Sequence, residues 1–107
     1  MSVRPLPIAS PRLTEDDATA TAALFRALGD PVRVRIINIV ANSSEPICIC
    51  DLVDELGLAQ PTVSHHVRKL ADLELLVREE RGKWTYLTIG AQACRRLGSL
   101  VDFRSCC

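Results

Sequence analysis

Apolar residues recur at helical spacing along much of the chain, and the first such stretch follows a helix start signal. Thr14 is a capping hydroxyl that precedes acidic residues in the first turn. We therefore predict a helix that begins there and ends at Gly29. Its apolar stripe consists of Ala20, Ala23, Leu24, Ala27 and Leu28.

A second helix is predicted immediately afterwards, with Asp30 as its N-cap and Pro31 at its first position. The polar side chains of Arg33, Arg35 and Asn38 are expected to face outward from this helix. The apolar residues that would pack inward are Val32, Ile36, Ile37, Ile39 and Val40.

The pattern changes after Leu73 from helical spacing to the alternation expected of strands. After the second helix we predict a loop (42–46) and then two short helices joined by a tight turn (48–73). Two strands (76–80 and 84–89) joined by a basic turn (81–83) follow, and a last helix (91–103) ends the domain. The order α-α-α-α-β-β-α, mainly helical with a β-hairpin wing, is that of an α+β winged helix-turn-helix domain. We expect a flexible N-terminal arm (1–13), this single domain (14–103) and a cysteine-containing tail (104–107).

Composition adds an expectation about assembly. The chain has 107 residues, of which 48% are hydrophobic and only 4% aromatic, so it has more aliphatic surface than one small core can use. We expect the chain to bury this additional apolar surface by homodimerisation through amphipathic terminal helices. A signal peptide and an apolar stretch long enough to span a bilayer are both absent from the sequence, so we expect a cytoplasmic protein with no membrane partner.

Charge limits the class of partner. Lys+Arg and Asp+Glu both number 13, and a net charge of zero argues against a generic polyanion binder. Acidic residues are nevertheless absent from Leu58 to Ala71, where cationic and imidazole side chains gather. A locally basic face on a neutral protein suits a regulator that must also release its partner.

The segment from residue 60 to 70 divides into two faces on a helical wheel. Val63, Val67 and Leu70 form an apolar stripe, while the opposite side chains can hydrogen-bond base edges or phosphates. We predict contacts with double-stranded DNA, the alternative being an ordinary solvated helix face and turn. His66 lies at the edge of the stripe and is expected to be packed and hydrogen-bonded. The predicted DNA-binding residues are Gln60, Thr62, Ser64, His65, Arg68 and Lys69 on the helix, with Arg81 and Lys83 at the hairpin tip.

Five cysteines in a reducing compartment are expected to be ligands or reactive thiols rather than structural disulfides. Cys48 and Cys50 lie where the third helix begins, and free N–H groups and the helix dipole there favour thiolates, which bind soft ions. Core packing beside the neighbouring isoleucines is the alternative. Residues two apart on a regular helix point about 200° away from each other. Both thiolates can therefore reach one ion only if the first turn opens or lies outside the helix.

Three motifs together resemble the ArsR/SmtB family of bacterial metalloregulatory repressors over roughly residues 20–90. They are Leu-Gly-Asp-Pro-Val-Arg (28–33), Cys-Ile-Cys-Asp-Leu (48–52), and Gln-Pro-Thr-Val-Ser-His-His (60–66) followed by Leu70. The resemblance implies a homodimeric repressor, not an enzyme, that needs no cofactor to fold. It would release its operator when As(III) or Sb(III) binds to cysteine thiolates.

The second motif is similar to the arsenic-responsive branch, where a further cysteine often lies three residues after the second. Here that position is Val53, so a third thiolate must come from elsewhere or the site has two ligands. Cys106 and Cys107 are the candidates, from either protomer, unless they are incidental thiols of an unstructured end. Cys94 shares a stripe with apolar residues of the last helix and is expected to be buried rather than to bind an ion. The predicted metal ligands are Cys48, Cys50, Cys106 and Cys107.

Other functions remain open on the residues alone. The same fold could sense Cd(II), Pb(II) or Zn(II), or the oxidation of either cysteine pair. A small thiol–disulfide enzyme is disfavoured because the strand-helix-strand pattern usual around redox cysteines is absent from the sequence. A protein-binding winged helix is the last alternative. For the ion-responsive repressor, we expect ligation to distort the third helix and to shift Ser64, His65 and Arg68.

Overall fold

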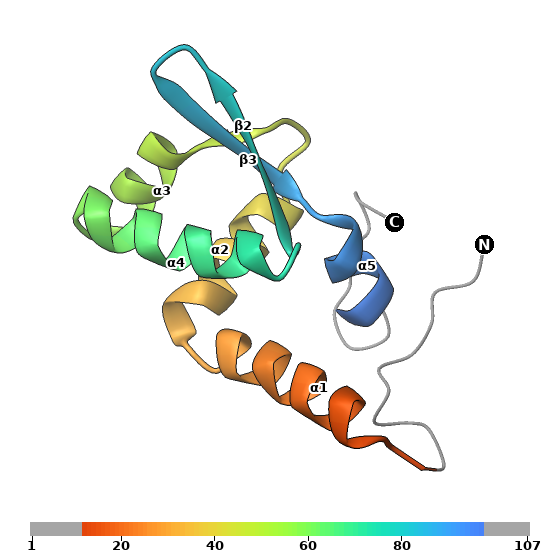
Figure 1. Ribbon diagram of the computed structural model, residues 1–107. Coiled ribbons are helices and arrows are strands. Elements are labelled where there is room, and N and C mark those ends of the chain that lie inside the picture. Colours follow the sequence, from red (N-terminus) through yellow and green to blue (C-terminus); the bar gives the residue numbers. More distant parts are fainter. Residues whose placement is uncertain (1–11, 98–107) are drawn as a thin grey trace.

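The computed structural model describes residues 12–97 (Figure 1). Its elements are α1 (Glu15–Leu28), α2 (Pro31–Ala41), β1 (Ile47–Cys48), α3 (Ile49–Leu56), α4 (Gln60–Asp72), β2 (Leu76–Arg81), β3 (Trp84–Ile89) and α5 (Ala91–Leu97). The predicted winged helix-turn-helix fold is confirmed, with α3 and α4 as the helix pair and the β2–β3 hairpin as the wing. Most of the predicted arm, residues 98–103 of the predicted last helix and the predicted tail lie outside the described residues.

The first two helices begin and end as predicted because their caps are local. The hydroxyl oxygen of Thr14 accepts a hydrogen bond from the backbone N–H of Asp17 at 3.0 Å, and Gly29 is the C-cap of α1. The carboxylate of Asp30 accepts one from the N–H of Val32 at 2.8 Å, ahead of Pro31 in the first turn of α2. Both signals involve residues within three positions of each other.

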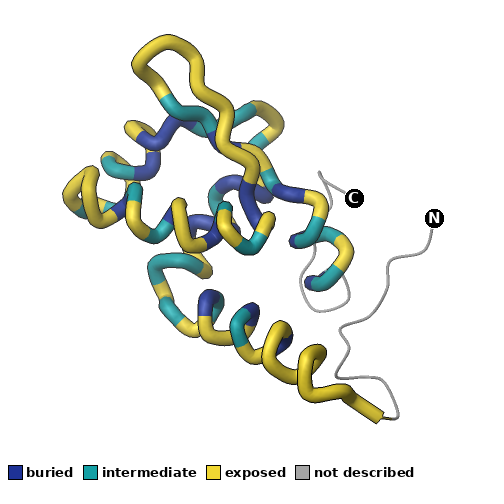
Figure 2. Tube along the Cα trace, viewed as in Figure 1, coloured by how far each residue is buried: buried dark blue, intermediate teal, exposed yellow. Residues whose placement is uncertain are grey.

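Most of the core lies between α2, α3, α4 and one face of the sheet, and α5 adds Ala93 and Leu97 to the same cluster (Figure 2). From α1, Leu24 also belongs to this cluster. By contrast, α1 extends away from this body and buries only Thr21, Leu24 and Ala27 (Figures 1 and 2). The largest fully buried side chains are those of Ile36, Leu52, Val63, Val67, Leu70, Leu75, Leu76 and Leu87. Within residues 12–97, none of the helices has both the length and the apolar character needed to cross a membrane.

A third strand, β1, was not predicted from the sequence, which indicated only a loop ahead of the third helix. It pairs antiparallel with β3, with Ile47 opposite Leu87 and Cys48 opposite Tyr86, so the sheet order is β1-β3-β2. Two residues are too few to show a strand's alternation, and pairing with a distant segment provides the stability of this strand. The hairpin differs only slightly from prediction: β2 continues to Arg81, and the turn is Gly82-Lys83 with Gly82 at φ 64°.

Candidate functional site

The polar face of α4 is exposed in the way that the helical wheel predicts. Val63, Val67 and Leu70 are buried to 1% exposure or less, and they hold the helix against the core. The opposite side chains of Gln60, Thr62, His65, Arg68 and Lys69 are exposed, and Ser64 is half-buried. No side chain caps the start of α4, and Pro61 in its first turn has no N–H to leave unsatisfied. The arrangement offers hydroxyl, imidazole and cationic groups together with a helix N-terminus suited to a phosphate.

Arg33 contradicts the expectation that it faces outward. Its side chain is half-buried, and Nε donates a hydrogen bond to Nδ1 of His66 on α4 at 3.1 Å. A terminal nitrogen of the same guanidinium donates to the carbonyl oxygen of Ala27 in the last turn of α1 at 3.3 Å. The sequence could not show the contact with His66 because the two partners are 33 residues apart. His66 is packed and hydrogen-bonded, as predicted.

The wing is less basic than the sequence suggests, because its cations have acidic partners on the same strand. Arg81 forms an ion pair with Glu79 at 2.8 Å, and Arg78 approaches Glu80 at 3.5 Å. Residues two apart on a strand lie on the same face, which is why these charges meet. All four side chains are at least 41% exposed, so a nearby phosphate could replace either carboxylate at small cost.

Aromatic rings support the two cations that were predicted to contact DNA. The guanidinium of Arg81 lies over the ring of Tyr86, 4.6 Å from its centroid. The ammonium of Lys83 lies 5.6 Å from the centroid of Trp84, which is 48% exposed. The wing therefore holds both cations in defined places near its tip.

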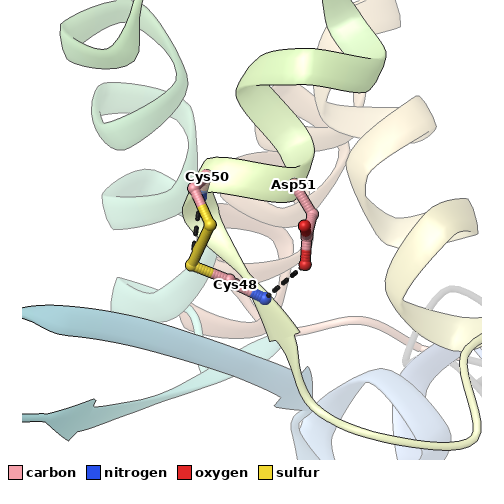
Figure 3. Close-up of a disulfide and its surroundings, with 3 residues drawn as sticks. All are labelled: Cys48, Cys50 and Asp51. Atoms are coloured by element: carbon pink, nitrogen blue, oxygen red, sulfur yellow. Dashed lines mark hydrogen bonds between the residues drawn. A yellow bond between two sulfur atoms is a disulfide. The ribbon is translucent and has the colours of Figure 1, made fainter.

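The thiol pair lies at the junction of β1 and α3. Cys48 has extended backbone angles (φ −70°, ψ 144°) and is the N-cap of α3, whereas Cys50 lies within its first turn. Their Cα atoms are 5.1 Å apart, and the structure joins their sulfur atoms as a disulfide (Figure 3). The sulfur atoms converge because Cys48 lies outside the helix. The first turn of α3 does not have to open for the two sulfurs to meet. The distortion of α3 on ion binding stays a prediction.

Reciprocal hydrogen bonds hold this helix start in place. The backbone N–H of Cys50 donates to Sγ of Cys48 at 3.3 Å, and the N–H of Cys48 donates to Oδ2 of Asp51 at 3.3 Å (Figure 3). Cys48 is only 5% exposed, while Cys50 is exposed. A ligand would therefore approach the pair from the side of Cys50.

The described residues supply two sulfur donors to a candidate ion site and no more. Once the disulfide is reduced, the two thiols fit a soft, thiophilic ion by donor type. A cluster of three or more His, Cys, Asp or Glu side chains able to hold a metal ion does not occur within residues 12–97. Cys94 packs against the core cluster but is half-buried rather than buried as expected, and it is disulfide-bonded. Cys106 and Cys107 lie outside the described residues.

Several curated proteins resemble this chain over most of its length. An uncharacterized HTH-type transcriptional regulator of Methanocaldococcus jannaschii is 33% identical over 81 residues, which are 76% of this chain and 90% of that protein. A putative arsenical resistance operon repressor of Halobacterium salinarum is 32% identical over 73% of this chain and 66% of its own length. A cadmium resistance regulatory protein homolog of Staphylococcus aureus is 28% identical over 79% of this chain and 69% of its own length.

Solved structures share the fold at lower sequence identity. NolR from Sinorhizobium fredii superposes with a TM-score of 0.68 at 21% identity, covering 90% of this chain and 98% of that one. A homodimeric winged helix-turn-helix DNA-binding domain from Mycobacterium bovis gives a TM-score of 0.64 at 18% identity, covering 78% and 77%. The family model described as "Bacterial regulatory protein, arsR family" matches residues 30–77. The chain thus belongs to the arsR family of bacterial regulatory proteins, which are DNA-binding transcription regulators and not enzymes.

Proposed function

We propose that this chain is a homodimeric repressor that binds operator DNA through α4 and the wing. In this proposal the repressor releases DNA when As(III) or Sb(III) binds to the thiolates of Cys48 and Cys50. The observation that carries the proposal is the convergence of the two sulfur atoms at the start of α3, a helix that packs directly against α4. A ligand there is one helix away from the polar face that would contact bases.

The choice of ion rests on donor chemistry and on the relatives. Thiolates prefer soft ions to hard ones, and arsenical resistance repressors are among the similar proteins. A cadmium resistance regulator is also among them, so Cd(II) is the nearest alternative inducer. Cys106 or Cys107, from the same protomer or its partner, is the candidate for a third thiolate; without it the site has two ligands.

The homodimer is supported by the exposure of α1. This helix extends from the body of the domain (Figure 1). Phe25 on it is 43% exposed. The Mycobacterium bovis domain that shares the fold is described as homodimeric. A two-fold dimer would present two α4 helices to half-sites about 34–36 Å apart on one face of the DNA.

Release requires the bound ion to favour the conformation that does not bind DNA. A coupling free energy of about 1–3 kcal/mol between the two ligands would lower DNA affinity roughly 5- to 150-fold. Since the sulfur atoms already converge with α3 intact, this free energy does not have to be spent on unwinding the helix.

The test is an electrophoretic mobility shift with a duplex containing the promoter region upstream of this chain's own gene. Arsenite is titrated in the presence of a phosphine reductant, which keeps thiols reduced without supplying competing thiols. Wild type should release the duplex, and the double variant Cys48→Ser with Cys50→Ser should bind it undiminished. Release of both proteins at the same arsenite concentration would refute the role of this pair. A parallel Cys106→Ser with Cys107→Ser variant tests the origin of the third thiolate.

A second candidate signal is oxidation of the same pair, which is favoured by the disulfide between Cys48 and Cys50 in the structure. Two thiols would lose two electrons and two protons to hydrogen peroxide, forming the S–S bond and two molecules of water. Peroxide added without reductant should then release DNA, and the phosphine should restore binding. Arsenite-driven release under fully reducing conditions would assign the primary signal to the ion.

A further inference from the structure

We propose that Tyr86 is a positioning residue. When a ligand binds at Cys48 and Cys50, the ring of Tyr86 shifts and changes the position of Arg81 on the wing. The inference rests on the proposed function, because it concerns how the same thiol pair acts on DNA binding. It assigns the signal a route through the sheet rather than through distortion of α3. Three successive contacts support it.

The first contact is the pairing of β1 with β3. Cys48 lies directly opposite Tyr86 in the antiparallel register. Opposite residues in such a pair point to the same face of the sheet, with Cβ atoms about 4.5–5.5 Å apart. Tyr86 is half-buried and Cys48 is 5% exposed, so a group added to this sulfur would be felt by its neighbours on that face.

The second contact joins the ring to the predicted DNA contact. The guanidinium of Arg81 lies 4.6 Å from the centroid of Tyr86. Its nitrogens also donate to Glu79, which is the residue opposite Tyr86 on β2. The ring and this carboxylate together set the place of the guanidinium. A shift of Tyr86 would therefore move Arg81 without any change in α4.

The third contact provides a reporter. Trp84 is the single tryptophan of the chain, and it lies opposite Arg81 at the end of the hairpin. It is 48% exposed, so its fluorescence responds to the surroundings of the wing. The wing's response to the thiol pair can therefore be measured in the absence of DNA.

The geometry of the thiol pair favours this route over the helix. Cys48 is at once the last residue of β1 and the N-cap of α3. The sulfurs converge with the first turn of α3 hydrogen-bonded, so occupancy at the pair does not have to alter the helix. The strand has only two residues, and the register with β3 places Tyr86 directly opposite Cys48.

The experiment compares wild type, Tyr86→Phe and Tyr86→Leu as full-length reduced proteins. Arsenite binding is followed by the ultraviolet absorption of the thiolate–arsenic bonds, and the wing is followed by Trp84 fluorescence. DNA affinity is measured by anisotropy with the promoter duplex, with and without saturating arsenite. Phenylalanine keeps the ring beneath Arg81, whereas leucine removes it.

All three proteins should bind arsenite with the same stoichiometry. Arsenite should change Trp84 emission and weaken DNA binding about tenfold or more in wild type and Tyr86→Phe. In Tyr86→Leu the emission change should be lost, and the ratio of DNA dissociation constants should fall below about twofold. Full coupling in Tyr86→Leu would overturn the inference.

Arg81→Gln is the third variant, and it leaves the core packing unchanged because Arg81 is exposed. It removes the end of the proposed route, so the arsenite-dependent ratio should also fall, and an unchanged ratio would contradict the inference. If wild type shows no effect of arsenite on DNA binding, the proposed function fails. The DNA-free Trp84 signal then still decides whether the thiol pair acts on the wing.

Discussion

The guanidinium of Arg33 donates a hydrogen bond to the imidazole of His66, with 3.1 Å between Nε and Nδ1. Because arginine can only donate, Nδ1 of His66 is the acceptor of this bond. The same guanidinium donates to Ala27 in α1. One side chain thereby ties α1, α2 and α4 together, and it sets the orientation of the polar face that we propose contacts DNA.

Alanine at Arg33 and at His66, separately and together, should reveal this coupling in a double-mutant cycle. We expect an interaction free energy of about 1 kcal/mol from urea unfolding, because the bond is partly buried and has a charged donor. Arg35→Ala, an exposed arginine on the same helix, is the matched control and should lose little stability. Strictly additive effects of the two substitutions would show that the bond contributes nothing in solution.

Removing a cation from the polar face of α4 should weaken DNA binding in a salt-dependent way. Arg68→Ala should lower affinity for all duplexes and reduce the slope of log affinity against log salt by about 1, if Arg68 contacts phosphate. Arg26→Ala removes an exposed cation from α1, outside both proposed DNA-binding elements, and should leave the slope unchanged. Equal slopes for Arg68→Ala and wild type would exclude this contact.

Freeing Arg81 from its carboxylate should strengthen DNA binding. In Glu79→Gln the 2.8 Å ion pair is lost, and we expect an increase in affinity of up to about fivefold at low salt. Glu80→Gln changes the net charge equally but does not contact Arg81, and it is the control for long-range electrostatics. The prediction fails if the two variants bind equally well, since Arg81 would then not be limited by Glu79.

Two glycine positions differ in what a side chain would meet. At Gly90 an added Cβ would collide with the backbone carbonyl of Glu74, a residue whose φ is 60°. Gly90→Ala should therefore destabilise the fold by about 2–3 kcal/mol. At Gly57 the space is open and only the left-handed backbone (φ +68°) opposes substitution, so Gly57→Ala should cost about 1–2 kcal/mol. Denaturant unfolding measures both, and a larger loss of stability at Gly57 than at Gly90 would contradict the prediction.

Local signals account for what the sequence could predict. The starts of α1 and α2 follow from Thr14 and Asp30, whose caps involve backbone groups two or three residues away. The division of α4 into two faces follows from helical periodicity alone. Features that depend on distant partners were missed, namely strand β1, which requires β3, and the inward turn of Arg33, which requires His66.

The wing and the thiol pair show two other limits of prediction from the sequence. The ion pair of Arg81 with Glu79 was within reach of sequence reasoning, since strand alternation places residues two apart on one face. The placement of Cys48 was not, because cysteine is outside the set of residues that usually cap helices. Periodicity therefore left open whether the two sulfurs could meet, and the extended backbone at Cys48 settles the question.

A cysteine at the N-cap stabilises the start of a helix less than the usual capping residues do, but it adds a reactive thiol at that position. Sulfur accepts hydrogen bonds weakly, so serine or aspartate at position 48 would anchor the eight-residue α3 more firmly. Neither replacement could be oxidised or could bind an ion that prefers sulfur. The sulfur of Cys48 is both the weak cap and the reactive atom. A substitution at this position that stabilises α3 would therefore also remove its ability to bind a soft ion or to be oxidised.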